Sequence, residues 1–115
     1  MIALMAALLL AAGAPKTVAG DYRTHQMEVG AQIELKADGS FRYMLDYGNV
    51  SEAAEGHWTA AQGVVHLNSD PLPKELLVEI ERSDAAFKDE QLLVDDGALM
   101  MRRHETVFKF SREQP

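Results

Sequence analysis

Two runs of alternating apolar and polar residues, joined by a single Asp-Gly pair, constrain the fold of this chain most strongly. They lie in residues 31–48, which read AQIELKADGSFRYMLDYG. A period of two predicts half-buried β-strands. A two-residue turn at the Asp-Gly pair would set Leu35 opposite Arg42 and would expose half of the aromatic side chains. We therefore expect a loop with an odd number of residues, because a one-residue slip moves every side chain to the other face.

A three-residue loop at residues 37–39 gives a register in which the apolar residues of both strands lie on the same face. It places Gly39 at the left-handed position that a type I turn followed by a bulge requires. The expected cross-strand pairs on one face are Leu35 with Phe41, Ile33 with Tyr43, and Val29 with Tyr47. This hairpin is therefore expected to bury its aromatic face.

A second hairpin is predicted in the segment EGHWTAAQGVVHLN. If residues 60–63 form a four-residue loop, Trp58 lies opposite Val65 on one face. His57 then lies opposite His66 on the other face.

The remaining segments are also predicted to be strands and turns. Residues 49–56 form a polar connector. Residues 76–82, LLVEIER, alternate as a strand that points Leu76, Val78 and Ile80 inward. Residues 91–103 form a hairpin around Asp96-Gly97, whose parity stays open because apolar residues are adjacent on both arms. Residues 106–112 form a last strand with Phe108 and Phe110 on one face.

These segments predict an all-β protein with eight to nine short antiparallel strands in meander order. Residues 21–115 then form a single domain, and an up-and-down barrel of this strand number is filled by side chains or holds one small ligand. Closure into a barrel removes exposed strand edges. The alternative is a two-sheet β-sandwich.

The first part of the chain predicts the compartment. Residues 1–20 combine an apolar stretch with small residues, as in a cleaved signal peptide, although no Lys or Arg precedes the apolar core. The alternative is a membrane-associated anchor. The expected location of the mature protein is therefore periplasmic or secreted.

Charge and cysteine content narrow the partners and the chemistry. The chain has 18 Asp and Glu against 11 Lys and Arg, so nucleic acid is not expected as a partner. It contains no cysteine, which excludes disulfides and thiolate metal sites. No cofactor and no stable membrane insertion after signal removal are expected. The oligomeric state stays open.

Three segments of the chain resemble a known class of proteins. Residues 20–48 contain a Gly-x-Tyr opening and an L-x-x-D-G-x-F-x-Y hairpin, and Gly56 to Trp58 read G-x-W. In this, residues 20–70 resemble small exported bacterial proteins of lipocalin-like, calycin type. The resemblance implies a barrel, export, and a role as a ligand carrier or envelope-stress sensor. Copper-stress lipoproteins of that group carry cysteines that this chain lacks, so their signalling role does not transfer.

Two sets of residues are candidate sites. An apolar ligand cavity is expected to be lined by aromatic side chains, and the alternative is that these rings simply fill the core. The aromatic set consists of Tyr22, Phe41, Tyr43, Tyr47 and Trp58. His57 and His66 are a weaker candidate for a copper or zinc site, against the alternative of exposed strand histidines.

The function predicted from these observations is an exported binding or accessory module of the cell envelope, with a small apolar ligand or an envelope protein as partner. A periplasmic copper- or zinc-binding protein is the second hypothesis. A small hydrolase or isomerase acting at the barrel mouth is the third. No catalytic motif is found in the chain, so the protein is not expected to be an enzyme.

Overall fold

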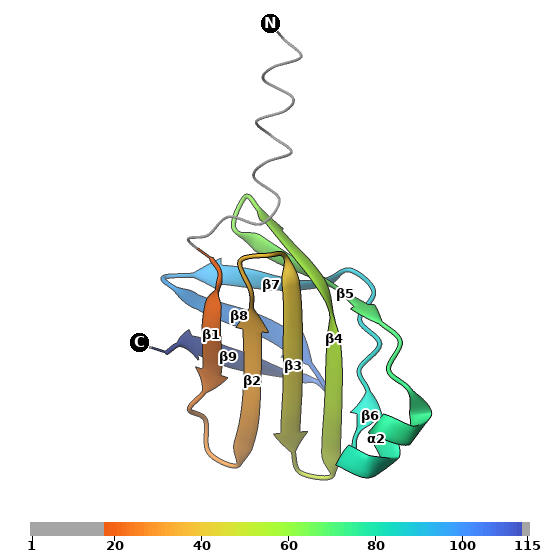
Figure 1. The fold of residues 1–115 in the computed structure, drawn as a ribbon. Helices are drawn as coiled ribbons and strands as arrows, with labels where there is room; N and C mark the ends of the chain where they lie inside the picture. Colours follow the sequence, from red (N-terminus) through yellow and green to blue (C-terminus); the bar gives the residue numbers. More distant parts are fainter. Residues whose placement is uncertain (1–17, 114–115) are drawn as a thin grey trace, which may run out of the picture.

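The computed structural model describes residues 18–113, and these form a closed antiparallel β-barrel with one short helix (Figure 1). Eight strands pair in a ring in the order β1, β2, β3, β4, β5, β7, β8, β9, and β9 pairs with β1 to close it. The ninth strand, β6, pairs in parallel with β4 at Glu52 and Ala53, before the part of β4 that pairs with β5. The bounds are β1 Gly20–Thr24, β2 Val29–Leu35, β3 Ser40–Tyr47, β4 Val50–Ala61, β5 Val64–Asp70, α2 Lys74–Ile80, β6 Ser83–Asp84, β7 Glu90–Asp95, β8 Ala98–Arg103 and β9 Thr106–Arg112. The predicted all-β barrel is confirmed, and the sandwich alternative is not what forms. Most of the predicted signal peptide of residues 1–20 lies outside the described residues, which begin at Val18.

The register of the first hairpin is confirmed. Leu35 lies opposite Phe41 and Ile33 lies opposite Tyr43, and all four side chains are buried. Gly39 has a φ of 93°, so the loop uses the left-handed conformation that glycine adopts without strain. The aromatic face of this hairpin is the face that lines the barrel interior.

The second hairpin has the predicted faces but a different register. Its loop is the two-residue turn Gln62-Gly63, with φ values of 54° and 78°, and Trp58 lies opposite Leu67 rather than Val65. A two-residue turn with positive φ at both positions matches the right-handed twist of the flanking strands. The shift of two residues keeps Trp58 inside the barrel. It moves His57 opposite Asn68, so the predicted pairing of His57 with His66 is wrong.

The sequence did not determine which residues of the third hairpin face the interior. A turn of the same two-residue kind determines it. Asp96 and Gly97 have φ values of 51° and 79°, and Asp95 pairs with Ala98. Leu92 is therefore buried, whereas Leu93 points outward with 61% of its surface exposed. The last strand is as predicted, with Phe108 and Phe110 buried.

Two predicted elements are wrong. Residues 49–56 are mostly strand, because β4 begins at Val50. Residues 74–80 form helix α2, which begins after Pro73 and ends at Glu81 in the left-handed conformation, φ 55°. Leu, Lys and Glu favour helices, and Pro73 lies at the N-cap of α2 in an extended conformation. The apolar side chains of α2 do not point inward, since none of its residues is buried.

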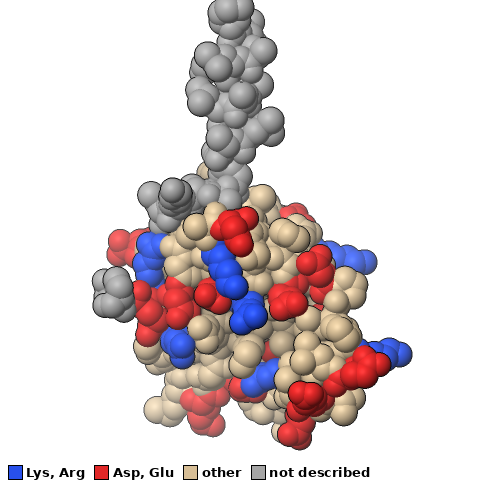
Figure 2. Space-filling model, in the orientation of Figure 1, with Lys and Arg blue, Asp and Glu red and all other residues tan. Residues whose placement is uncertain are grey.

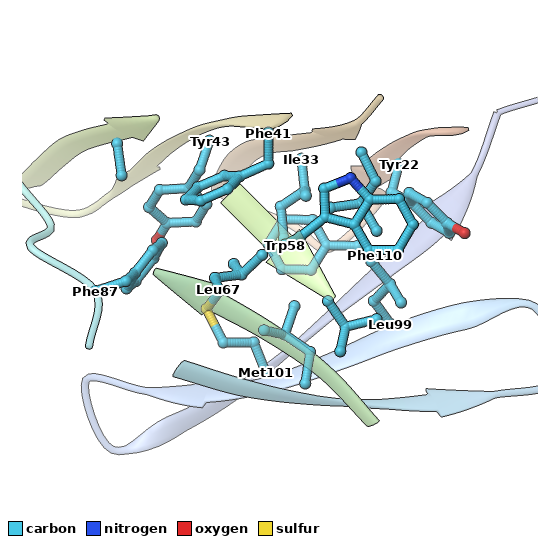
Figure 3. Packing of buried hydrophobic residues seen from close by; sticks show 14 of the residues in the cluster. Tyr22, Ile33, Phe41, Tyr43, Trp58, Leu67, Phe87, Leu99, Met101 and Phe110 are labelled. Carbon is cyan, nitrogen blue, oxygen red and sulfur yellow. The ribbon is translucent and has the colours of Figure 1, made fainter. Parts of the chain in front are cut away.

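The barrel interior is packed with large side chains (Figure 3). Trp58 lies among them with 2% of its surface exposed, and its indole nitrogen donates to the carbonyl of Lys36 at 2.8 Å. The largest fully buried side chains are Trp58, Tyr43, Phe41, Phe108, Phe110, Ile33, Leu35, Leu45, Leu67, Leu92, Leu99 and Met101. At this strand number the interior is just wide enough for side chains to fill it.

A candidate binding site at one end of the barrel

The five aromatic residues predicted to line a ligand cavity all contribute to the core. Tyr22, Phe41, Tyr43 and Trp58 are buried, and Tyr47 is half-buried. The ring centroids of Tyr43 and Phe87 are 4.8 Å apart, and those of Tyr47 and Phe108 are 5.3 Å apart. In the structure these side chains pack together in the barrel interior. Their contact with a ligand stays a prediction.

The two histidines predicted to hold a metal lie on the outer face with separate partners. His57 is 3.9 Å from Asp70, and His66 is 2.6 Å from Asp89. Among the described residues no group of three His, Asp or Glu side chains is arranged to hold a metal ion.

A polar cluster that the sequence did not reveal closes the barrel end next to α2 and the β3–β4 turn. Glu52 lies on the inward face of β4 with only 4% of its surface exposed. Its carboxylate accepts hydrogen bonds from the Tyr43 hydroxyl at 2.7 Å and from Arg103 at 2.7 and 3.1 Å. His104, in the β8–β9 turn, lies 3.1 Å from the same carboxylate. A buried carboxylate needs such partners because its transfer from water is costly.

Arg103 joins this cluster to the surrounding core. One of its nitrogens donates to the carbonyl of Ala85 at 3.2 Å, and its guanidinium carbon lies 4.9 Å from the centre of the Phe87 ring. Glu90 is 3.8 Å away on β7. Every buried side-chain nitrogen and oxygen of the described residues has a hydrogen-bond partner, so the cluster is fully satisfied.

The cluster shifts the pKa values of its acidic members in different directions. Burial raises the pKa of Glu52, but hydrogen bonds from Arg103, Tyr43 and His104 outweigh it and hold this pKa below its usual range. Burial raises the pKa of Glu90, which has a weaker interaction with Arg103. Burial and the neighbouring Glu52 carboxylate raise the pKa of Tyr43, so its hydroxyl remains a donor. Glu52 is therefore the charged partner of Arg103 at neutral pH.

An open hollow of about 680 Å³ lies over this cluster, between α2 and the start of β4. Leu77 and Val78 of α2 supply apolar surface, and Val50 supplies more from β4. Hydrogen-bonding groups come from the β3–β4 turn, from the segment after α2 and from the β8–β9 turn. The lining residues are Asn49, Val50, Ser51, Glu52, Leu77, Val78, Glu81, Arg82, Ser83 and His104. Apolar surface with a few convergent polar groups is typical of ligand sites.

The segment that follows α2 is tied to the barrel by Arg82. Its guanidinium donates to both carboxylate oxygens of Asp46, at 3.0 and 2.9 Å, and to the carbonyl of Leu45 at 3.2 Å. Hydrogen bonding from Arg82 lowers the pKa of Asp46. Ser83 also donates to the carbonyl of Ser51 at 3.1 Å. One rim of the hollow is therefore held in place by a bidentate ion pair.

Sequence reasoning missed Glu52, Arg103 and His104, although one signal was present. If the alternation that places Trp58 inside is continued backwards along the chain, it reaches Glu52. A carboxylate at an inward position requires a buried cation, and Arg103 is in phase with the inward Leu99 and Met101.

Within residues 18–113 no helix is long and apolar enough to cross a membrane. Comparisons with protein-family models, with curated proteins and with solved structures find no match to this chain.

Proposed function

We propose that this protein is an exported binding module of the cell envelope, of the lipocalin-like type that residues 20–70 resemble. The support for export is the apolar leader in residues 1–20. The support for binding is the open hollow at the barrel end, which offers apolar surface from Leu77 and Val78 beside several hydrogen-bonding groups. The hollow is the observation on which the proposal rests.

The hollow is a better candidate for the ligand site than the barrel interior. The interior positions that would line a cavity hold Trp58, Tyr43 and Phe41, each with 2% or less of its surface exposed. A ligand there would have to displace packed rings, and close-packed cores lose contacts when they are opened. Val78, in contrast, is 78% exposed, so an apolar group of a ligand can contact it without displacing packed side chains.

A neutral apolar dye, N-phenyl-1-naphthylamine, tests this proposal. We expect its fluorescence to rise on binding to the wild-type protein. Val78→Asp should weaken binding about ten-fold or more, because it places a charge in the apolar wall and removes the burial of a valine side chain. The dissociation constant from a fluorescence titration is the measurement.

Leu93→Asp is the matched control, since Leu93 is an outward-facing apolar residue on β7 with 61% of its surface exposed. This change should leave dye binding unaltered. Equal effects of the two variants, or no dye binding at all, would reject the hollow as the site. Dye binding that ignores Val78→Asp but quenches Trp58 would place the ligand in the barrel interior instead.

A further inference from the structure

Helix α2 presents apolar side chains that the rest of the described chain does not cover. Val78 is 78% exposed, and Leu76 and Ile80 are 38% and 37% exposed. Leu77, Val78 and Glu81 all line the hollow. We call Glu75, Leu77, Val78 and Glu81 the α2 surface. A surface of this kind marks an interaction site when it borders a concave region.

We infer that the occupant of the hollow is a segment of a partner protein that carries apolar and basic side chains side by side. This inference rests on the proposed function and specifies the ligand of the same site. The apolar side chains of the segment would contact Leu77 and Val78, and its Lys or Arg residues would lie beside Glu75 and Glu81.

The charge around α2 selects this partner. Glu75 precedes Val78 by three positions, which places the two side chains beside each other on the helix surface. Neither Glu75 nor Glu81 forms an ion pair with a cation of the described residues. Figure 2 shows acidic side chains with a basic side chain beside them at the lower right, where Figure 1 places α2. Complementary charge steers association and rejects partners of like charge.

The same charges exclude two other occupants. An anionic lipid surface would be repelled, because such surfaces attract basic segments and the α2 surface is acidic. A second copy of this chain, docked through the same surface, would bring Glu75 and Glu81 of both copies together. Like charges at an interface cost free energy, so self-association through α2 is disfavoured.

Fluorescence anisotropy with labelled synthetic peptides tests the inference. Three short peptides of equal length are compared, built from Lys and Leu, from Glu and Leu, and from Lys and Ser. We expect saturable binding of the Lys/Leu peptide alone. The Glu75→Gln/Glu81→Gln double variant should bind this peptide roughly five- to ten-fold more weakly, as expected for the loss of two exposed charge pairs.

The matched control is the double variant Asp95→Asn/Asp96→Asn, which changes the net charge by the same amount in the β7–β8 turn. It should bind the Lys/Leu peptide as the wild type does. Equal weakening in both double variants would show a general charge effect and overturn the inference. Equal binding of the Lys/Ser or Glu/Leu peptide would also overturn it.

The dye experiment separates failure of this inference from failure of the proposed function. If Val78→Asp abolishes dye binding but the Lys/Leu peptide does not bind, the hollow is a site and the inferred partner is wrong. If dye binding is independent of Val78, the proposed site itself is wrong. Sedimentation that shows a dimer of the wild type and a monomer of Val78→Asp would make a second copy the occupant and overturn the inference.

Discussion

Replacing Arg103 with methionine is expected to lower the free energy of unfolding by about 3–5 kcal/mol, the loss typical of breaking a buried ion pair on one side. Methionine has a similar length but cannot donate to Glu52, which would remain buried with a charge. The stacking of the guanidinium on Phe87 and its bond to the carbonyl of Ala85 would be lost as well. Urea unfolding followed by the fluorescence of Trp58 measures the change.

Arg102→Met is the matched control, because Arg102 is the neighbouring residue on β8 and points outward. It should change the free energy of unfolding by no more than about 0.5 kcal/mol. Adding Glu52→Gln to Arg103→Met should recover much of the loss, since glutamine is neutral and still accepts from Tyr43. Equal losses for Arg102→Met and Arg103→Met would show that the buried charge of Glu52 does not contribute to stability.

Stability should also fall on acidification through Glu52. Its pKa is lowered in the folded protein, so the stability that it contributes is present above its ordinary pKa of 4.5 and is lost as the pH falls below that value. Glu90 acts in the opposite direction, because a raised pKa contributes stability that is lost as the pH rises. Glu90 is present in both the wild type and Glu52→Gln. Most of its effect therefore cancels when the unfolding free energies of the two proteins are subtracted. This difference should shrink as the pH is lowered below 4.5, and a constant difference would contradict the lowered pKa.

The parts of the fold that were predicted correctly are those where large apolar side chains alternate without interruption. In the first hairpin, Phe41, Tyr43 and Leu45 share one face, and Gly39 fixes the loop. Around the second turn, Ala60 and Ala61 precede the loop and Val64 and Val65 follow it. These neighbouring residues are all apolar. The alternation pattern therefore did not distinguish the four-residue loop from the two-residue turn, which place the same side chains inside.

The candidate site was harder to predict because its parts are distant in sequence. Glu52 lies in a segment of small residues, where Ala53 and Ala54 give no strong alternation. Its partner Arg103 is on β8, which β5 and β7 separate from β4 in the ring, so the pair exists only once the barrel has formed. Helix α2, which makes the apolar wall, has apolar positions that suit a helix as well as a strand. The alternation of apolar and polar residues therefore predicted the core. The candidate site could not be predicted in this way, because its residues come together only in the closed barrel.

Tyr43→Ala should lower the free energy of unfolding by about 3–5 kcal/mol, as for other large aromatic residues in a core. The variant removes a ring that is 1% exposed and packs edge-on against Phe87, and it also removes a donor to Glu52. Tyr43→Phe keeps the ring and loses only the hydrogen bond to a charged group, so its cost should be about 1.5–3 kcal/mol. The measurement is again urea unfolding.

The control for Tyr43 is its neighbour Arg42, which lies on the outer face of β3 opposite Glu34 and Glu55. Arg42→Ala should cost no more than about 1 kcal/mol, because substitutions of exposed side chains outside the core change stability little. If Tyr43→Phe were as costly as Tyr43→Ala, the hydroxyl and its bond to Glu52 would account for the whole effect and the ring would contribute nothing. If Tyr43→Phe cost nothing, the polar cluster would not need this donor. The expected order, with Tyr43→Ala most costly and Arg42→Ala least, requires both the packed interior and the polar cluster that closes its end.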